Sequence, residues 1–422
     1  MGQADPPTHH HRAREDEWAP ESNAREIRRF GTAATVAFAL LTVGSNLPGP
    51  LLPIYRDQLG LSTFSVTALF AVYLFALVAT FTVIAGTPMS RYSASVLPIA
   101  VLICITSDAA LIAGHDTAPW LFVGRILNGI AVGLGTGAIA TLVLVARGER
   151  GRTIAATGTL AGSFLGLAGS AVIAQYLPWP TVTVYGIHIG ALAVALLALA
   201  ATLRRVRSFL AGALRAPAKS TTPPPIEHVT VVEAHPPETS LRLQWAGYTL
   251  GIAGWAIGGI VVGLLPTVVA DELDSASIIT TALAPIVLIG TACLSPMLLR
   301  SLRPGPIAAT IAISAVACTV GVWLGSLPVI LTCCLAWGVG QGFAYAAGLR
   351  IVTAGLSPVD QGRIASRFAS ACYGFTGVLS MGTGLVVTAF GIRSGMVVMA
   401  TTFVILCTVT IVLGRGRWPG PR

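Results

Sequence analysis

Long apolar runs alternate with short polar breaks along nearly the whole chain. Each run approaches the roughly 20 residues that a helix needs to cross the hydrocarbon core of a bilayer. Runs of this length favour α-helices over barrel strands, because backbone groups in lipid must bond within their own segment. The pattern predicts twelve transmembrane spans, near residues 31–53, 64–87, 95–114, 120–146, 153–177, 181–203, 243–269, 276–299, 306–326, 328–354, 366–390 and 394–413.

One long polar segment, residues 204–242, divides these spans into two sets of six. Its prolines, Pro223, Pro224 and Pro225 among them, favour an extended linker without a packed core. The first thirty residues contain no apolar stretch of the kind found in a cleavable signal peptide. The predicted organisation is a polar tail (1–30), a first six-helix bundle (31–203), the linker (204–242), a second six-helix bundle (243–413) and a basic tail (414–422).

Composition and charge agree with an all-α, polytopic membrane protein. Charged residues make up 10% of the 422 residues, whereas soluble domains carry about 25%. The 26 lysines and arginines fall, apart from Arg56, Arg125 and Arg393, on one side of the predicted membrane. The positive-inside rule makes that side cytoplasmic and places both termini there. We interpret the net charge of +9 as an orientation and lipid-surface signal, and expect no nucleic-acid partner.

The two halves of the chain repeat short motifs at a common offset. "ERGRTIA" at residues 149–155 resembles "DQGRIAS" at residues 360–366, an offset of 211. "TPMSR" at residues 87–91 resembles "SPMLLR" at residues 295–300, an offset of 208. A half-length repeat predicts two pseudo-symmetric six-helix bundles, an architecture associated with alternating access around a site at the membrane midplane.

Three further motifs resemble those of the major facilitator superfamily. "GTPMSRYSAS" keeps Gly86 and Arg91 of the family's loop motif, with Ser90 in place of the acid that helps to latch the cytoplasmic side. "RILNG" resembles the span-four motif R-x-x-Q-G, with Asn128 in place of glutamine. "GTLAGSFLGL" is similar to the span-five antiporter motif, with Ser163 in place of proline.

The resemblance implies a secondary transporter. Residues 46–62 and 70–77 resemble the first two helices of bacterial drug:proton antiporters, which implies a multi-pass monomer in the bacterial cytoplasmic membrane. In such a transporter, the residues expected to serve conformational change are Gly86, Arg91, Gly158, Gly162 and Gly166. The glycines of span five allow close helix packing.

Asp108 and Arg125 place one charge of each sign inside adjacent antiparallel spans. Counting from the helix ends puts both roughly 8–9 Å below the outer surface. An isolated charge inside a span costs about 2.5–3.5 kcal/mol, so a pair is expected. Asp108 is the only acid predicted well inside a span. We therefore assign proton coupling to Asp108 and Arg125, against the alternative of a purely structural ion pair that pins spans three and four together.

The resemblance implies that spans one, four, seven and ten line the substrate cavity. On these spans, amide and aromatic side chains suit a bulky, mostly apolar solute. The alternative for each is helix packing. The candidate substrate-binding residues are Asn46, Asn128, Tyr248, Trp255, Trp337, Gln341 and Tyr345.

His188, the only histidine predicted inside a span, is interpreted as a helix-contact residue, with titration near neutral pH as the alternative. All seven cysteines fall in predicted spans without polar neighbours typical of ligands, so we expect neither disulfides nor a metal site.

These features predict a proton-coupled exporter of small hydrophobic or amphipathic compounds, of the multidrug antiporter type. The alternative is a proton symporter that takes up a small polar metabolite. An enzyme is not expected, because the chain has no H-E-x-x-H or P-loop motif and no paired carboxylates. The expected partners are a small-molecule substrate, protons and the lipid bilayer, and no cofactor is expected.

Overall fold

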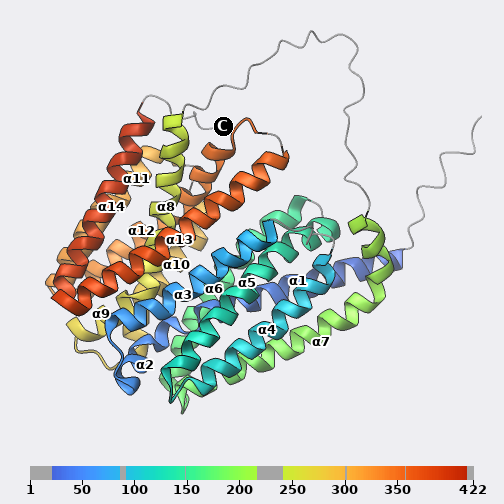
Figure 1. The fold of residues 1–422 in the computed structure, drawn as a ribbon, viewed down its shortest axis with the longest axis horizontal. Coiled ribbons are helices and arrows are strands. Elements are labelled where there is room, and N and C mark those ends of the chain that lie inside the picture. Colours follow the sequence, from blue (N-terminus) through green and yellow to red (C-terminus); the bar gives the residue numbers. More distant parts are fainter. Residues whose placement is uncertain are drawn as a thin grey trace, which may run out of the picture.

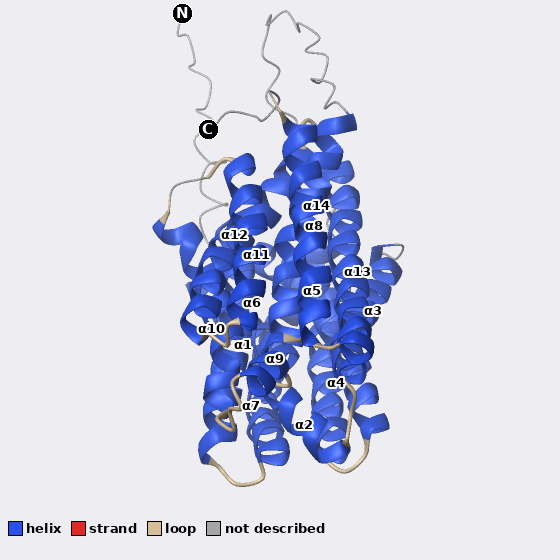
Figure 2. Ribbon diagram, turned by 90° about the vertical axis from the view of Figure 1, so that its left-hand side faces the viewer, coloured by secondary structure: helices blue, strands red, loops and turns tan. Residues whose placement is uncertain are grey.

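The computed structural model describes residues 21–85, 92–147, 149–215, 241–299, 302–356 and 358–415. Within these ranges the regular elements are all helical (Figure 2). They are α1 (Glu21–Asn46), the 3-10 helix η1 (Gly49–Leu51), α2 (Leu52–Leu59), α3 (Thr63–Ala85), α4 (Ser93–Ala113), α5 (Ala118–Arg147), α6 (Glu149–Tyr176), α7 (Pro180–Arg215), α8 (Leu241–Gly263), α9 (Leu265–Glu272), α10 (Ile278–Leu298), α11 (Pro304–Trp323), α12 (Leu327–Thr353), α13 (Pro358–Phe390) and α14 (Ile392–Gly414).

The described residues contain 12 helical segments long and apolar enough to cross a membrane. Each predicted span overlaps one of them, so the predicted all-α fold with twelve spans is confirmed. The helices form two groups, α1–α7 and α8–α14, each around its own apolar core (Figure 1). A fold of two six-helix bundles agrees with the repeat in the sequence.

The two bundles meet at one end and diverge at the other (Figure 1). We call the end where α1 and α8 begin and α7 and α14 finish the terminal face. The end that carries α2 and α9 is the opposite face. Between the bundles, α3 packs on α13 and α6 packs on α10.

The first span of each bundle is broken near the opposite face. Helix α1 ends at Asn46, and the chain continues through η1 into α2. Pro48 and Pro50 have no backbone N–H, so they cannot extend the hydrogen-bond ladder of α1. In the second bundle, α8 ends at Gly263 and Pro266 stands in the first turn of α9. Span one is therefore bent near the opposite face, and span seven has a corresponding break.

Two predicted boundaries differ from the structure. Helix α7 continues to Arg215, so the first part of the segment predicted as linker is helical. Helix α1 begins at Glu21, inside the predicted tail. Arginines at helix ends can direct their charged groups into the headgroup layer, so polar composition alone does not mark where a membrane helix ends. Residues 1–20, 216–240 and 416–422 lie outside the described part of the chain.

Candidate functional site

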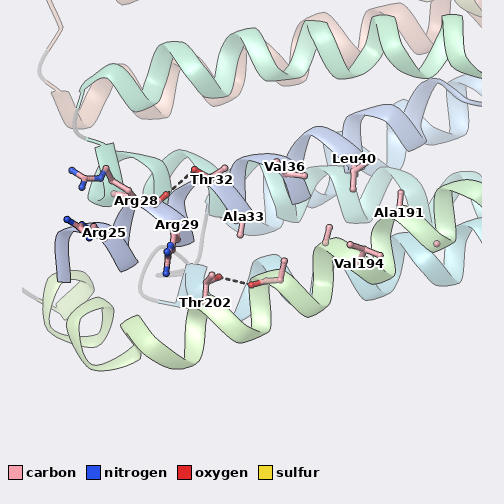
Figure 3. A pocket seen from close by; sticks show the side chains of 14 residues that line it. Arg25, Arg28, Arg29, Thr32, Ala33, Val36, Leu40, Ala191, Val194 and Thr202 are labelled. Atoms are coloured by element: carbon pink, nitrogen blue, oxygen red, sulfur yellow. Dashed lines mark hydrogen bonds between the residues drawn. The ribbon is translucent and has the colours of Figure 1, made fainter. Parts of the chain in front are cut away.

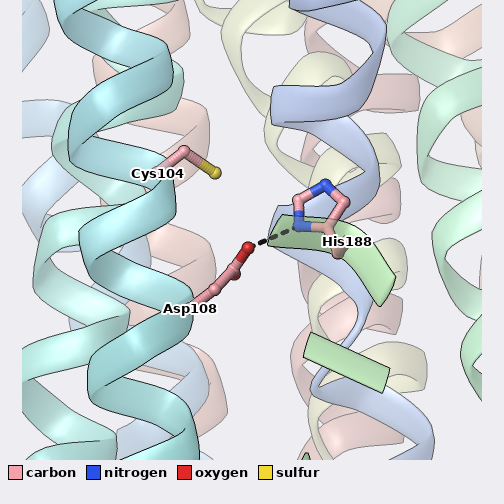
Figure 4. Close-up of side chains that lie close together, drawn as sticks. All are labelled: Cys104, Asp108 and His188. Atoms are coloured by element: carbon pink, nitrogen blue, oxygen red, sulfur yellow. Dashed lines mark hydrogen bonds and ion pairs between the residues drawn. The ribbon is translucent and has the colours of Figure 1, made fainter. Parts of the chain in front are cut away.

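Asp108 contacts His188, a residue that lies 80 positions away in sequence. The Nδ1 atom of His188 on α7 lies 2.6 Å from Oδ2 of Asp108 on α4 (Figure 4). The two side chains are 4% and 0% exposed, so the pair is sealed from both water and lipid. The predicted ion pair between Asp108 and Arg125 is therefore wrong. Asp108 is bound across to α7 instead.

The hydrogen bonds of His188 define how many protons the pair holds. Its Nε2 lies 3.0 Å from the carbonyl oxygen of Leu40 on α1. A carbonyl oxygen only accepts, so Nε2 carries a hydrogen. Nδ1 then either donates to an ionised Asp108 or accepts from a protonated one. In both cases one proton lies between Nδ1 and Oδ2, and the pair as a whole is neutral.

Cys104 and Asn128 surround this pair. The donor atoms of Cys104, Asp108 and His188 all lie within 4.8 Å of one another (Figure 4). The expectation that no cysteine has ligand-like polar neighbours is therefore wrong for Cys104. Two ligands of one tetrahedral zinc ion would lie about 3.3 Å apart. The 2.6 Å separation of the His188 and Asp108 atoms is instead that of a short, charge-assisted hydrogen bond.

Gly44 on α1 gives the imidazole its space. A methyl group at Gly44 would lie 2.7 Å from Cε1 of His188, 3.2 Å from Sγ of Cys104 and 3.4 Å from Nδ2 of Asn128. Carbon atoms pack at about 3.5–4.0 Å, so a side chain here would displace the ring. The absence of a side chain at Gly44 therefore lets α7 place His188 directly against α1.

Arg125 binds the carbonyl end of α1, where that helix is broken. Its Nη1 donates to the carbonyl oxygen of Ser45 and its Nε to that of Leu69, both at 3.0 Å. The guanidinium also lies 4.6 Å from the ring centroid of Tyr73. Ser170 donates to the carbonyl of Leu47 at 2.7 Å. The carbonyls of Ser45 and Leu47 lie where α1 loses its regular hydrogen bonds, and a cation at a helix C-terminus is favourable.

Arg125 therefore stabilises the break in α1, which explains a positive charge inside span four. The prediction that it neutralises Asp108 is corrected by these contacts. Distance along each helix put the two charges at one depth, but it gave no information on the direction of either side chain. Asn128 lies three residues further along α5 and is fully buried. It faces Cys104, with its Nδ2 3.9 Å from Sγ.

Three predicted substrate residues come together in a chain of aromatic rings. Trp255 on α8 lies 4.9 Å from Tyr345 on α12 and 4.8 Å from Tyr373 on α13. Phe368 joins Tyr345 to Tyr248, at centroid distances of 5.2 Å and 5.5 Å. Tyr373 continues the chain across to Phe81 of the first bundle at 6.0 Å. We call Tyr248, Trp255, Tyr345, Phe368 and Tyr373 the aromatic cluster.

Trp337 is a correction to the predicted substrate wall. It is fully buried, donates its indole N–H to the carbonyl of Ile311 at 3.2 Å, and lies 6.1 Å from the ring of Phe403. The residue is thus part of the core of the second bundle. Trp337, Gln341 and Tyr345 follow one another at intervals of four residues along α12. On a helix with 3.6 residues per turn, each such interval rotates the side-chain direction by about 40°. Trp337 and Tyr345 consequently face directions about 80° apart.

Two of the three predicted substrate-binding amides, Gln341 and Asn46, have different surroundings. Gln341 is 6% exposed and lies against Gly258 of α8, where a methyl group would be 2.7 Å from its Nε2. Its Oε1 is buried without a hydrogen-bond partner among the described residues. Asn46 bonds within its own helix, to the carbonyl of Thr42 at 3.1 Å and Oγ of Ser45 at 2.9 Å. Gln341 therefore has a buried acceptor without a partner among the described residues, as does Asn128 through its Oδ1.

The glycines predicted to serve conformational change pack in different ways. A methyl group at Gly162 would lie 2.7 Å from the carbonyl oxygen of Ala39, and one at Gly166 would meet the carbonyl of Val43. These two glycines bring α6 onto α1 inside the first bundle. A methyl group at Gly158 would have no atom of the described residues within 4 Å. Gly86 and Arg91 lie outside the described part of the chain.

Polar contacts join the bundles at the opposite face. The guanidinium of Arg56 on α2 binds both carboxylate oxygens of Asp271 on α9, at 2.7 Å and 2.6 Å. The backbone N–H of Phe64 donates to Thr388 at 2.9 Å, and Gln175 accepts from the backbone of Ile279 at 3.3 Å. Arg56 lies on α2 and Asp271 on α9, the short helices that follow the breaks in spans one and seven. The opposite face is thus closed by contacts between the two bundles, and the ion pair joins elements related by the repeat.

Two six-helix bundles with paired broken helices define a polytopic membrane transporter. The chain belongs to the Major Facilitator Superfamily, whose sequence model matches residues 34–381. It is therefore a transporter rather than an enzyme. No curated protein matches the chain.

Solved transporters share the fold at low sequence identity. An auto-inhibited POT family peptide transporter superposes with a TM-score of 0.68 at 13% identity, covering 94% of this chain and 98% of that one. The nucleoside transporter NupG gives 0.61 at 14% identity, with 93% and 100% covered. A bacterial homologue of the human lysosomal transporter Spinster, inward-facing and unoccupied, gives 0.61 at 13% identity, with 92% and 97% covered.

Proposed function

We propose that this transporter exports small hydrophobic or amphipathic compounds in exchange for protons, and that the Asp108–His188 pair carries the proton. The observation behind this proposal is the 2.6 Å contact between two buried titratable side chains on different helices. With the shared proton, both ring nitrogens of His188 make a hydrogen bond, and without it only one of them can donate.

Proton loss has a mechanical consequence at this site. Without the shared proton the imidazole keeps one hydrogen, so a lone pair faces either the carboxylate of Asp108 or the carbonyl oxygen of Leu40. Two facing acceptors repel each other, so α7 loses its contact with α4 or with α1, by separation of the helices or by a turn of the ring. Turning the ring gives up the bond to α1, five residues before the carbonyl that Arg125 binds at the break. Protonation thus controls how α1, α4 and α7 are held together.

The groups around the pair allow such a change. Cys104 lies on the same helix as Asp108 and is neutral as a thiol. Tyr185 on α7 is within electrostatic reach of both Asp108 and Arg125, and its hydroxyl is bonded to that of Tyr55 at 3.1 Å. Arg125 on α5 is held by backbone carbonyls. None of these neighbours shares a proton with Asp108, whereas His188 does.

The aromatic cluster supports a bulky, mostly apolar substrate. Its rings belong to α8, α12 and α13, and Tyr373 contacts Phe81 of the first bundle, so the cluster lies between the two bundles. Gln341 supplies an uncharged acceptor on α12. Aromatic faces and one amide suit an apolar compound or organic cation better than a carboxylate or phosphate.

The contacts at the opposite face support a conformation that is closed on that side. With both termini in the cytoplasm, as the distribution of basic residues predicts, that side is the outside of a bacterial cytoplasmic membrane. The Arg56–Asp271 pair then serves as an outer gate that has to open for release. We expect one chain to contain a complete pathway and to act as a monomer.

Inside-out membrane vesicles test the proposal. Respiration establishes a pH gradient that is read by a quenched dye, and a panel of neutral and cationic drugs is added. Asp108→Asn keeps a donor for Nδ1 in its amide but has no transferable proton. Cys104→Ser is the matched control, because it changes a neighbouring group and leaves the pair intact. We expect some of the compounds to dissipate the gradient in vesicles with the wild type or Cys104→Ser. The same compounds should not dissipate it in vesicles with Asp108→Asn or in empty vesicles.

The other outcomes contradict separate parts of the proposal. If the gradient is dissipated equally with Asp108→Asn, the proton is not carried by this pair, although antiport itself would still hold. If no compound dissipates the gradient with the wild type, the proposed proton antiport is contradicted. Proton symport of a small polar metabolite, tested by uptake into right-side-out vesicles, would then become the leading function.

A further inference from the structure

A groove of about 1280 Å³ runs along the outside of the first bundle between α1 and α7 (Figure 3). Its volume exceeds the roughly 300–1,000 Å³ of typical small-molecule pockets. Val36 and Val194 line it and are 49% and 68% exposed, so the groove opens outward rather than into the bundle. In a membrane, that opening faces lipid.

Small side chains make the groove hollow. On α7 the lining includes Gly190, Ala191, Ala195 and Ala198, and Ala33 faces them from α1. From Ala33 to Leu40 the apolar part extends roughly 10 Å along the helix. This length lies within one leaflet's share of the hydrocarbon core, about 15 Å. The apolar part is thus suited to an extended hydrocarbon chain lying parallel to the helices.

Three arginines stand at the end of the groove nearest the terminal face. Arg25, Arg28 and Arg29 follow the i, i+3, i+4 spacing and share one side of α1 with Thr32 and Val36 (Figure 3). They occupy about 6 Å along the helix. A headgroup layer is roughly 5–8 Å thick on each side of a bilayer. The charges therefore begin where the apolar lining ends, as a headgroup would require.

Among the described side chains around these arginines, the net charge is positive although one acid is present. Glu26 accepts from Arg29 and from Arg205 of α7, both at 3.1 Å. These five residues (Arg25, Glu26, Arg28, Arg29 and Arg205) carry a formal net charge of +3. Guanidinium groups bind phosphate oxygens through paired hydrogen bonds. A zwitterionic headgroup would bring a cation into this field, whereas an anionic headgroup would not.

We propose that this groove binds an anionic phospholipid, with its phosphate at Arg25, Arg28 and Arg29 and an acyl chain along α1 and α7. The inner end of the groove lies at Leu40, whose carbonyl accepts the hydrogen bond from His188. The bound lipid thus spans the two helices that this hydrogen bond joins. The site is independent of the transported substrate and of the direction of transport.

Native mass spectrometry of the purified full chain tests the proposal. Phosphatidylglycerol and phosphatidylcholine with identical acyl chains are titrated separately. The variant R25Q/R28Q/R29Q removes the arginines of the groove. The matched control R350Q/R363Q/R367Q removes the same charge from the second bundle. A further variant, A191L/A198L, fills the apolar part and keeps every arginine. Unfolding temperatures show whether each variant remains folded.

We expect the wild type and the control triple variant to bind phosphatidylglycerol at least tenfold more tightly than phosphatidylcholine. Each arginine near a membrane surface contributes roughly fivefold toward anionic lipid. The groove triple variant should lose most of this preference, and A191L/A198L should bind both lipids more weakly. An unchanged preference in R25Q/R28Q/R29Q, or an equal loss in the control, would overturn the proposal. Displacement by excess inorganic phosphate would also overturn it, because the site would then recognise free phosphate.

Discussion

Replacing Gly44 by alanine tests the packing around Asp108 and His188, the pair proposed to carry the proton. The added methyl group would lie 2.7 Å from Cε1 of His188. Restoring a normal carbon–carbon distance requires a displacement of about 1 Å. The ring then moves away from Asp108 or Leu40, or α1 moves away from α7. Either movement takes contacts of 2.6 Å and 3.0 Å toward or beyond the limit of a hydrogen bond.

The magnitude follows from two opposing terms. Overpacking costs about 1–3 kcal/mol, and alanine gains about 0.5–1 kcal/mol over glycine inside a helix. We expect a net loss of roughly 1–2 kcal/mol, together with impaired drug-dependent proton movement. Gly186→Ala is the matched control, because it lies on α7 near His188 and no atom of the described residues comes within 4 Å of the added methyl group.

Two measurements on purified protein and vesicles decide the outcome. Thermal unfolding in detergent should rank Gly186→Ala at or above the wild type and Gly44→Ala below it. Drug-dependent dissipation of a pH gradient should persist in Gly186→Ala and be reduced in Gly44→Ala. A Gly44→Ala protein as stable and as well coupled as the wild type would refute the contact between His188 and α1.

The remaining predictions concern the break in α1 and the opposite face. Arg125→Lys retains the charge but loses the two-carbonyl geometry, so stability should fall by about 1.5–3 kcal/mol in thermal or denaturant unfolding. An unchanged stability would contradict its role at the end of α1. Arg56→Asp should separate α2 from α9, as measured between spin labels on those helices, and adding Asp271→Arg should restore the distance. A double variant that stays as open as the single one would show that the pair does not close this face.

The hydrophobic pattern was sufficient for the architecture. Long apolar runs and the half-length repeat predicted twelve spans in two bundles. These features are local, because they depend on residue order within one helix. The extension of α7 to Arg215 was missed, since arginines occur both in linkers and at the ends of membrane helices.

The candidate site depended on helix rotation, which the sequence does not show. Asp108 was recognised as an isolated acid, but its partner was assigned to the neighbouring span. His188 was the missed residue, and its status as the only histidine predicted inside a span was the available signal. Arg125 binds backbone carbonyls, and the amino-acid sequence does not show which carbonyls lie near a side chain. Trp337 shares a spacing with Tyr345, but the accumulated rotation buries it in the core.

The central claim is that the transported compound is exchanged for the proton shared by Asp108 and His188, so drug binding should release that proton. The most direct measurement is the change in pH when a transported drug binds to the purified protein in weakly buffered detergent solution. We predict release of about one proton per wild-type chain and none from Asp108→Asn, with drug binding by both confirmed separately. Equal proton release from Asp108→Asn would contradict the claim.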